Sequence, residues 1–205
     1  MKDFKTKYAP KTFADLIIHD PNNVIKPILQ KYASGQINQN RIFVGDAGTG
    51  KSTLAKVLAA ELYRSHGDDD IAFYVKMANE KDDVQYRPNM LVNPWRNNSK
   101  VIWHILDEVD KCNHKNLYNV LHHTLTDENG YKYLLTANSV VGIPETILSR
   151  AKPMFIDCPT PEEFFPRAKQ IVQLENIVAS DEKIMQMLKA GERNLRGYYK
   201  AFKYL

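Results

Sequence analysis

The chain has 205 residues, 43% of them hydrophobic and 25% charged, and a formal net charge of +4 at pH 7. This composition allows one domain with a proper core, or a domain with a small addition, and the mild positive charge permits a nucleic-acid partner. No segment approaches the roughly 18 apolar residues of a membrane helix and the N-terminus lacks a secretion signal, so we expect neither membrane insertion nor secretion. Cys112 and Cys158 are isolated, which argues against a zinc site and favours the cytoplasm.

Helix-like and strand-like segments alternate up to about residue 158, which predicts an α/β fold with a parallel sheet. The near-continuous apolar run V-I-W-H-I-L at 101–106 is typical of a strand that is buried on both faces. The segment Lys81–Lys100 gives no assignable pattern. In chain order, we expect a helix over 23–34, a strand over 41–44, a helix over 53–63, strands over 71–77 and 101–106, a helix over 114–125, and strands over 131–137 and 153–156.

The pattern changes after Pro159. The segments 161–174, 180–189 and 193–204 all have the apolar periodicity of amphipathic helices. We therefore expect two domains, an α/β domain over 1–158 and a small helical domain over 159–205.

Residues 45–52 read G-D-A-G-T-G-K-S, the G-x-x-x-x-G-K-S pattern of a phosphate-binding loop, between a predicted strand and a predicted helix. Backbone N–H groups and the positive end of the helix dipole are expected to hold an anion there. Lys51 would reach the β- and γ-phosphates, and the Ser52 hydroxyl would bind Mg²⁺. A glycine-rich surface turn is the alternative. The expected nucleotide contacts are Gly45, Asp46, Ala47, Gly48, Thr49, Gly50, Lys51, Ser52 and Thr53.

Two acidic residues, Asp107 and Glu108, follow the apolar run at 101–106. Ligands of parallel sheets bind at the carboxyl ends of the strands, so we expect this pair beside the phosphate loop. Asp107 would hold Mg²⁺ through water, and Glu108 would orient and deprotonate the attacking water. A solvated acidic turn is the alternative. Together with the loop, the pair predicts hydrolysis of a nucleoside triphosphate.

The chain resembles the AAA+ ATPases of DNA polymerase clamp loaders, the replication factor C small-subunit group and its phage counterparts. Its opening K-Y-A-P-K-T-F at 7–13 is similar to the K-Y-R-P-K-T-F of that family, which lies against the adenine. The resemblance therefore implies that Tyr8 and Pro10 contact the base. Ala9 stands where the family has arginine, so that arginine's contact is lost.

The same resemblance implies roles for an asparagine and two arginines. Asp107–Lys111 matches the family's D-E-A/V-D stretch, and L-T-A-N at 135–138 resembles the sensor 1 strand, whose asparagine positions water, as Asn138 would. The segment 143–151 resembles I-x-P…L-x-S-R-C, which makes Arg150 an arginine finger for a neighbouring subunit and predicts that hydrolysis needs an oligomer. N-L-R at 194–196 resembles the D-x-R of sensor 2, with Arg196 as its arginine. Either arginine could instead be a surface residue.

For the whole chain, the resemblance implies a P-loop AAA+ sheet flanked by helices and followed by an all-helical lid, with ATP and Mg²⁺ as ligands. The implied partners are primer–template DNA, a sliding clamp and other loader subunits in a homo- or hetero-oligomeric ring. The family's helical collar is expected to be absent, as in a compact viral version acting in the host cytoplasm. Basic candidates for contacts to the DNA backbone are Lys76, Lys81, Arg87, Arg96, Lys111 and Lys115.

Two alternatives to clamp loading stay open. One is a helicase loader or another AAA+ ATPase that acts on DNA. The other is a subunit that binds nucleotide only to stabilise an assembly, although the set Lys51, Asp107, Glu108 and Asn138 argues for hydrolysis.

Overall fold

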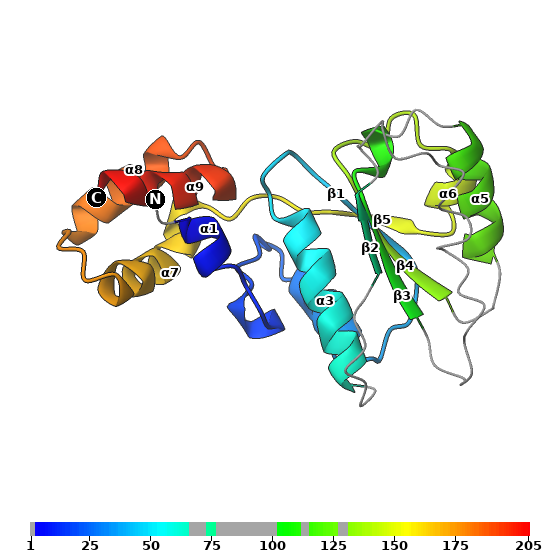
Figure 1. The fold of residues 1–205 in the computed structure, drawn as a ribbon, viewed down its shortest axis with the longest axis horizontal. Helices are drawn as coiled ribbons and strands as arrows, with labels where there is room; N and C mark the ends of the chain where they lie inside the picture. Colours follow the sequence, from blue (N-terminus) through cyan, green and yellow to red (C-terminus); the bar gives the residue numbers. More distant parts are fainter. Residues whose placement is uncertain (1–2, 66–72, 77–101, 112–114, 127–130) are drawn as a thin grey trace.

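The computed structural model describes residues 3–65, 73–76, 102–111, 115–126 and 131–205, and contains a parallel sheet that lies between helices (Figure 1). Its five strands follow the order β2-β3-β4-β1-β5. Val44 pairs with both Ala137 and Phe155, so three strands end level with one another at their carboxyl ends. The parallel sheet predicted from the sequence is confirmed. The strands are β1 (Arg41–Val44), β2 (Phe73–Lys76), β3 (Ile102–Asp107), β4 (Tyr131–Ala137) and β5 (Lys152–Phe155).

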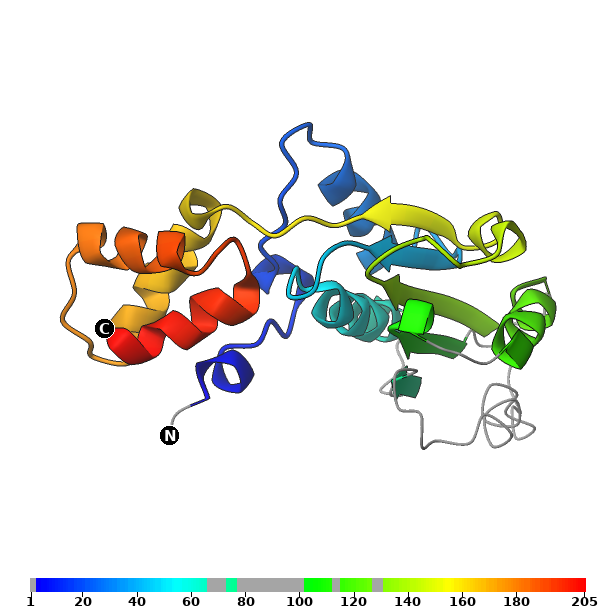
Figure 2. The same ribbon diagram turned by 90° about the horizontal axis from the view of Figure 1, so that it is seen from above.

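Helices cover both faces of this sheet (Figures 1 and 2). On one face α2 (Ile25–Ala33) and α3 (Lys51–Ser65) bury their apolar sides, and on the other α5 (Lys115–Thr126) and α6 (Glu145–Leu148) do so. The strands supply both cores because their side chains alternate between the faces. In β3, for example, Trp103 and Ile105 join the first core and Leu106 joins the second.

The C-terminal helices α7 (Pro161–Leu174), α8 (Asp181–Ala190) and α9 (Leu195–Ala201) lie to one side of the sheet and share a separate core (Figures 1 and 2). Each begins at a residue whose side chain accepts a backbone N–H: Thr160 for α7, Ser180 for α8 and Asn194 for α9. These caps satisfy N–H groups that have no partner within the helix, and so fix where each helix starts.

The short N-terminal helix α1 (Phe4–Lys7) packs on the C-terminal helices and not on the sheet (Figure 2). The Phe4 ring stacks on Phe202 with 5.6 Å between centroids, and the Tyr8 hydroxyl donates to Glu175 at 2.8 Å. The chain then passes through the one-turn helix η1 (Phe13–Asp15) to the sheet. Phe4 and Tyr8 therefore pack with the C-terminal helices, although the predicted boundary at residue 158 assigns them to the α/β domain.

Several observed bounds differ from the predicted ones for local reasons. Helix α3 starts at Lys51, since Lys51 and Ser52, the last two residues of the phosphate-binding motif, already belong to its first turn, and β3 extends to Asp107. The last predicted helix, over 193–204, starts as α9 only at Leu195, because Arg193 has a left-handed backbone that no α-helix contains. It ends in the one-turn helix η4 (Phe202–Tyr204). The segment 81–100 lies outside the described residues, among which no helix is long and apolar enough to cross a membrane.

Candidate nucleotide-binding site

The loop at 45–50 connects β1 to α3, and Lys51 and Ser52, the first two residues of α3, follow it directly. Gly48 and Gly50 have φ values of 89° and 99°, which residues with a side chain rarely adopt. A Cβ at Gly48 would also come within 2.2 Å of Oδ1 of Asn194. The glycines of the motif are thus required both by the turn and by a close approach of the C-terminal helices.

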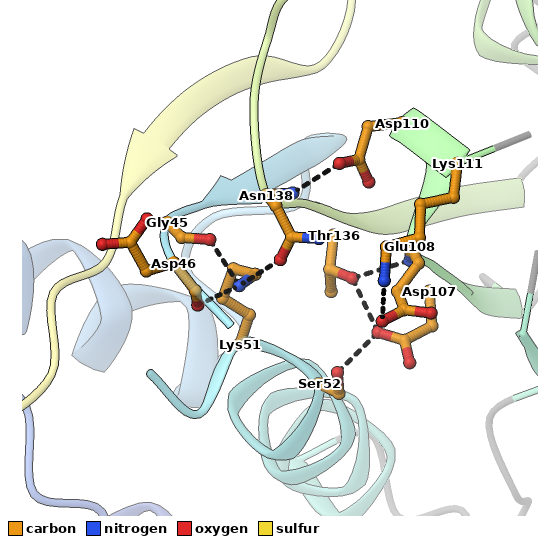
Figure 3. A network of polar contacts seen from close by, with 10 residues as sticks. All are labelled: Gly45, Asp46, Lys51, Ser52, Asp107, Glu108, Asp110, Lys111, Thr136 and Asn138. Atoms are coloured by element: carbon orange, nitrogen blue, oxygen red, sulfur yellow. Dashed lines mark hydrogen bonds and ion pairs between the residues drawn. The ribbon is translucent and has the colours of Figure 1, made fainter. Parts of the chain in front are cut away.

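The ammonium group of Lys51 is buried in the loop and points at its carbonyls (Figure 3). Nζ donates to the carbonyl oxygens of Gly45 at 2.6 Å and Asp46 at 2.7 Å, and to Oδ1 of Asn138 at 3.2 Å. Burial lowers the pKa of Lys51, and the nearby Asp110 opposes that shift. A phosphate group in the loop would replace these neutral acceptors with charged ones.

Asp107 ends β3 with its carboxylate beside the start of α3 (Figure 3). Oδ1 of Asp107 accepts a hydrogen bond from the Ser52 hydroxyl at 2.5 Å and another from the Thr136 hydroxyl at 2.6 Å. The carboxylate is buried, so these charge-assisted bonds replace the water it has lost. The structure therefore brings together the loop serine and the strand aspartate that the two sequence motifs predict.

Glu108 follows with a left-handed backbone, at φ 60°. This conformation costs a residue with a Cβ roughly 1–2 kcal/mol. The Glu108 N–H donates to Oγ1 of Thr136 at 3.0 Å, and its carboxylate forms a 2.8 Å ion pair with Lys111. Glu108 lines the same cavity as the phosphate loop.

Asn138 comes directly after β4, and contacts hold both its backbone and its side chain. Its N–H donates to Oδ2 of Asp110 at 3.0 Å, while its Oδ1 accepts from Lys51. The ends of β3 and β4 and the phosphate loop thus carry two neighbouring groups of hydrogen-bonded residues, one around Lys51 and one around Asp107, and Figure 3 shows this polar network.

A cavity extends from this network toward the C-terminal helices. Its far end is mainly apolar and is lined by Pro10, Leu16, Ile17, Phe164 and Tyr199, among others. A cavity with one polar and one apolar end suits a nucleotide, whose base is flat and weakly polar and whose phosphates are charged. Tyr8 does not line this cavity: its ring lies in the helical core beside Phe4, although its carbonyl oxygen accepts from the Tyr199 hydroxyl.

The start of α9 contacts the phosphate loop directly. Nδ2 of Asn194 donates to the Ala47 carbonyl at 3.0 Å, and the Leu195 N–H donates to the Gly48 carbonyl at 3.1 Å. The helical part and the loop are therefore linked by hydrogen bonds.

Three arginines differ in their relation to the cavity. Arg196 lines it, and its charge contributes to lowering the Lys51 pKa, so it lies at the phosphate end. Arg167, on α7, also lines it, and no sequence motif singled this residue out. Arg150 does not line it: the residue is half-buried between α6 and β5, and its side chain donates to the Thr126 hydroxyl at 2.7 Å and the Thr146 carbonyl at 2.8 Å.

Of the candidate DNA contacts, Lys111 is described and exposed, and it is the partner of Glu108. Lys76 lies in β2 and Lys115 in α5, but their side chains are not described. Lys81, Arg87 and Arg96 lie outside the described residues.

Residues 41–156 match the family described as "ATPase family associated with various cellular activities (AAA)". The chain is 24% identical over 218 residues to DNA polymerase III subunit tau/gamma of Haemophilus influenzae, a match that covers 93% of this chain and 30% of that protein. It is 25% identical over 201 residues to replication factor C subunit 5 of Mus musculus, covering 93% of this chain and 56% of the relative. The chain thus spans less than two thirds of the length of these relatives.

Solved structures share the fold at lower identity. The RuvB Holliday junction branch migration motor of Thermotoga maritima superposes with a TM-score of 0.70 at 18% identity, over 94% of this chain and 63% of that one.

Proposed function

This chain belongs to the AAA family of ATPases, and from that premise we propose that it hydrolyses ATP as a subunit of a DNA sliding-clamp loader. The observation that carries the ATPase assignment is the meeting of two hydrogen-bonded groups at one edge of the sheet. Lys51 bonds to Asn138, and Asp107 bonds to Ser52 and, through Thr136, to Glu108. Clamp loading is supported by the relatives named as DNA polymerase III and replication factor C subunits, which match 93% of this chain.

ATP would lie with its phosphates on the loop at 45–52 and its base among the apolar residues between the N-terminal segment and α7. Lys51 would exchange its bonds to the Gly45 and Asp46 carbonyls for bonds to the β- and γ-phosphates. Arg196 would contact the γ-phosphate from the helical side.

Mg²⁺ fits the donors that the chain offers. Ser52 and Asp107 supply a hydroxyl and a carboxylate oxygen at one point, and the described residues hold no group of three or more possible metal-binding side chains. One carboxylate plus phosphate oxygens and water is how Mg²⁺ is usually bound at nucleotide sites. When bound, Mg²⁺ would neutralise charge on the β- and γ-phosphate oxygens.

In the hydrolytic step, Glu108 would accept a proton from a water molecule whose oxygen attacks the γ-phosphorus, and the bond to the ADP oxygen would break. Asn138 would orient this water, since its amide is fixed by Lys51 and its backbone by Asp110. Arg150 does not line the chain's own cavity, and would supply its charge to a neighbouring subunit.

Lys111 links the proposed DNA contact to the proposed base, because its ammonium pairs with Glu108. A DNA phosphate would compete with the Glu108 carboxylate for the Lys111 ammonium. DNA binding at Lys111 would then affect water activation at Glu108, three residues earlier in the chain.

The test is ATP turnover measured for the chain alone, with primer–template DNA, with a sliding clamp from the same source, and with both. We expect a larger rate with both than either gives alone, and a smaller DNA response in Lys111→Met. Turnover that responds to DNA but never to a clamp would favour another AAA ATPase acting on DNA. Turnover that responds to neither would contradict the clamp-loader proposal.

A further inference from the structure

Thr136 is a fully buried residue of β4 whose hydroxyl joins the two acidic residues of the site (Figure 3). Oγ1 lies 2.6 Å from Oδ1 of Asp107 and 3.0 Å from the backbone nitrogen of Glu108. A backbone N–H can only donate and an ionised carboxylate can only accept. The single hydroxyl proton therefore points to Asp107, and an oxygen lone pair faces Glu108.

These two bonds hold a backbone turn that an extended strand would not make. Successive residues of a strand point to opposite faces, so Asp107 and Glu108 would face apart if β3 simply continued. Instead the chain becomes left-handed at Glu108, at φ 60°. The Asp107 carboxylate then meets Ser52, while Glu108 lines the cavity that Ser52 also lines.

We propose that Thr136 is a positioning residue for ATP hydrolysis, whose hydroxyl holds the left-handed backbone of Glu108 and the orientation of the Asp107 carboxylate. This inference rests on the proposed function, in which Glu108 activates water. Threonine suits the task because its branched Cβ restricts χ1 and so aims the hydroxyl. The sequence gives no sign of this role, since a threonine in an apolar strand is common.

Exchange of the hydroxyl for a methyl group separates positioning from packing. Thr136→Val keeps the branched shape and removes both bonds, whereas Thr136→Ser keeps the hydroxyl. We expect Thr136→Val to lower kcat by roughly 10- to 100-fold, the effect of losing bonds to charged or backbone groups in a buried site. The Kd for ATP should stay within about threefold, because Lys51 and the loop are unchanged, and Thr136→Ser should recover most of the turnover.

Hydrogen exchange at the Glu108 amide gives a readout that needs no nucleotide. In the wild-type chain this N–H is bonded to Thr136 and should exchange slowly. It should exchange at least about tenfold faster in Thr136→Val and remain slow in Thr136→Ser. Leu134→Val is the matched control, a buried residue of the same strand whose side chain belongs to the core under α3, and it should leave the Glu108 amide slow.

If Thr136→Val does not fold, Thr136→Ala removes the same hydroxyl without placing a methyl group against the carboxylate, and the same results are expected. Unchanged Glu108 exchange, or unchanged kcat in a folded variant without the hydroxyl, would overturn the inference. A wild-type chain that binds ATP but never hydrolyses it would contradict the proposed function instead, and hydrogen exchange would then decide alone whether Thr136 holds Glu108.

Discussion

Asn194 is the side chain through which the C-terminal helices contact the phosphate loop, and its two ends can be tested separately. Its Oδ1 accepts from the backbone N–H of Arg196 at 2.9 Å and caps α9, while its Nδ2 donates to the Ala47 carbonyl at 3.0 Å. Asn194→Asp keeps an oxygen for the cap but cannot donate to Ala47. Asn194→Ala loses both contacts.

The expected losses of stability follow from these contacts. Loss of a helix cap costs about 0.5–2 kcal/mol, and loss of one neutral hydrogen bond about 0.5–1.5 kcal/mol. Asn194→Ala should therefore lower the free energy of unfolding by roughly 1–3 kcal/mol, and Asn194→Asp by about 1 kcal/mol. At a size of about 200 residues, 1 kcal/mol corresponds to roughly 2–4 °C in Tm. We expect the free energy of unfolding to be highest in the wild type, lower in Asn194→Asp and lowest in Asn194→Ala.

The assay is thermal unfolding combined with hydrogen exchange of the loop amides at 45–50. Ser180→Ala is the matched control, because it removes the cap of α8, which accepts from Lys183 N–H, without touching the loop. Ser180→Ala should lower Tm and leave the hydrogen exchange of the loop amides unchanged, whereas both Asn194 variants should make the loop amides exchange faster. Asn194→Asp with wild-type stability and wild-type loop exchange would refute the idea that this amide couples the helices to the loop.

Three further predictions test the site and the core. Lys51→Ala should weaken ATP binding by roughly 100-fold, because it removes the charge aimed at the phosphates, and unchanged affinity in a calorimetric titration would contradict the site. Arg150→Ala and Lys51→Ala, each inactive alone, should regain turnover when mixed, since one chain's arginine can serve its neighbour's pocket; co-assembled mixtures without activity would argue against a shared site. Burial lowers the pKa of His104 from 6.5 to about 4, so the unfolded chain binds a proton first as the pH falls. The free energy of unfolding should then fall by about 3 kcal/mol between pH 6.5 and 4, and urea unfolding of His104→Phe should show a flatter pH dependence.

Patterns that lie within a short stretch of sequence predicted the structure well. The strand over 131–137 has the bounds that its apolar run predicted, and 161–174 is α7 as the periodicity indicated. These segments have strong patterns and clear ends, such as Thr160 and Pro161 at the start of α7. The phosphate loop likewise needs glycines at fixed positions, so its pattern is readable from the chain alone.

Features that depend on distant partners were not readable. The family resemblance implied that Tyr8 contacts the base, but Tyr8 does not line the cavity: its side chain packs in the helical core and its hydroxyl donates to Glu175, a residue 167 positions away. No local pattern reports that contact. Arg167 reaches the cavity only because α7 is oriented by its packing against α8 and α9. Thr136 matters through one hydroxyl, and the apolar pattern of β4 is the same with valine in its place.

ATP turnover and ATP binding, measured side by side in the wild-type chain and in Glu108→Gln, test the central claim most directly. The amide keeps a polar group at the cavity but cannot accept the proton of the attacking water. We predict equal ATP affinity and a turnover at least about 100-fold lower in the variant, the usual contribution of a general base. Turnover within a few-fold of the wild type would contradict the assignment of this site as the centre of ATP hydrolysis.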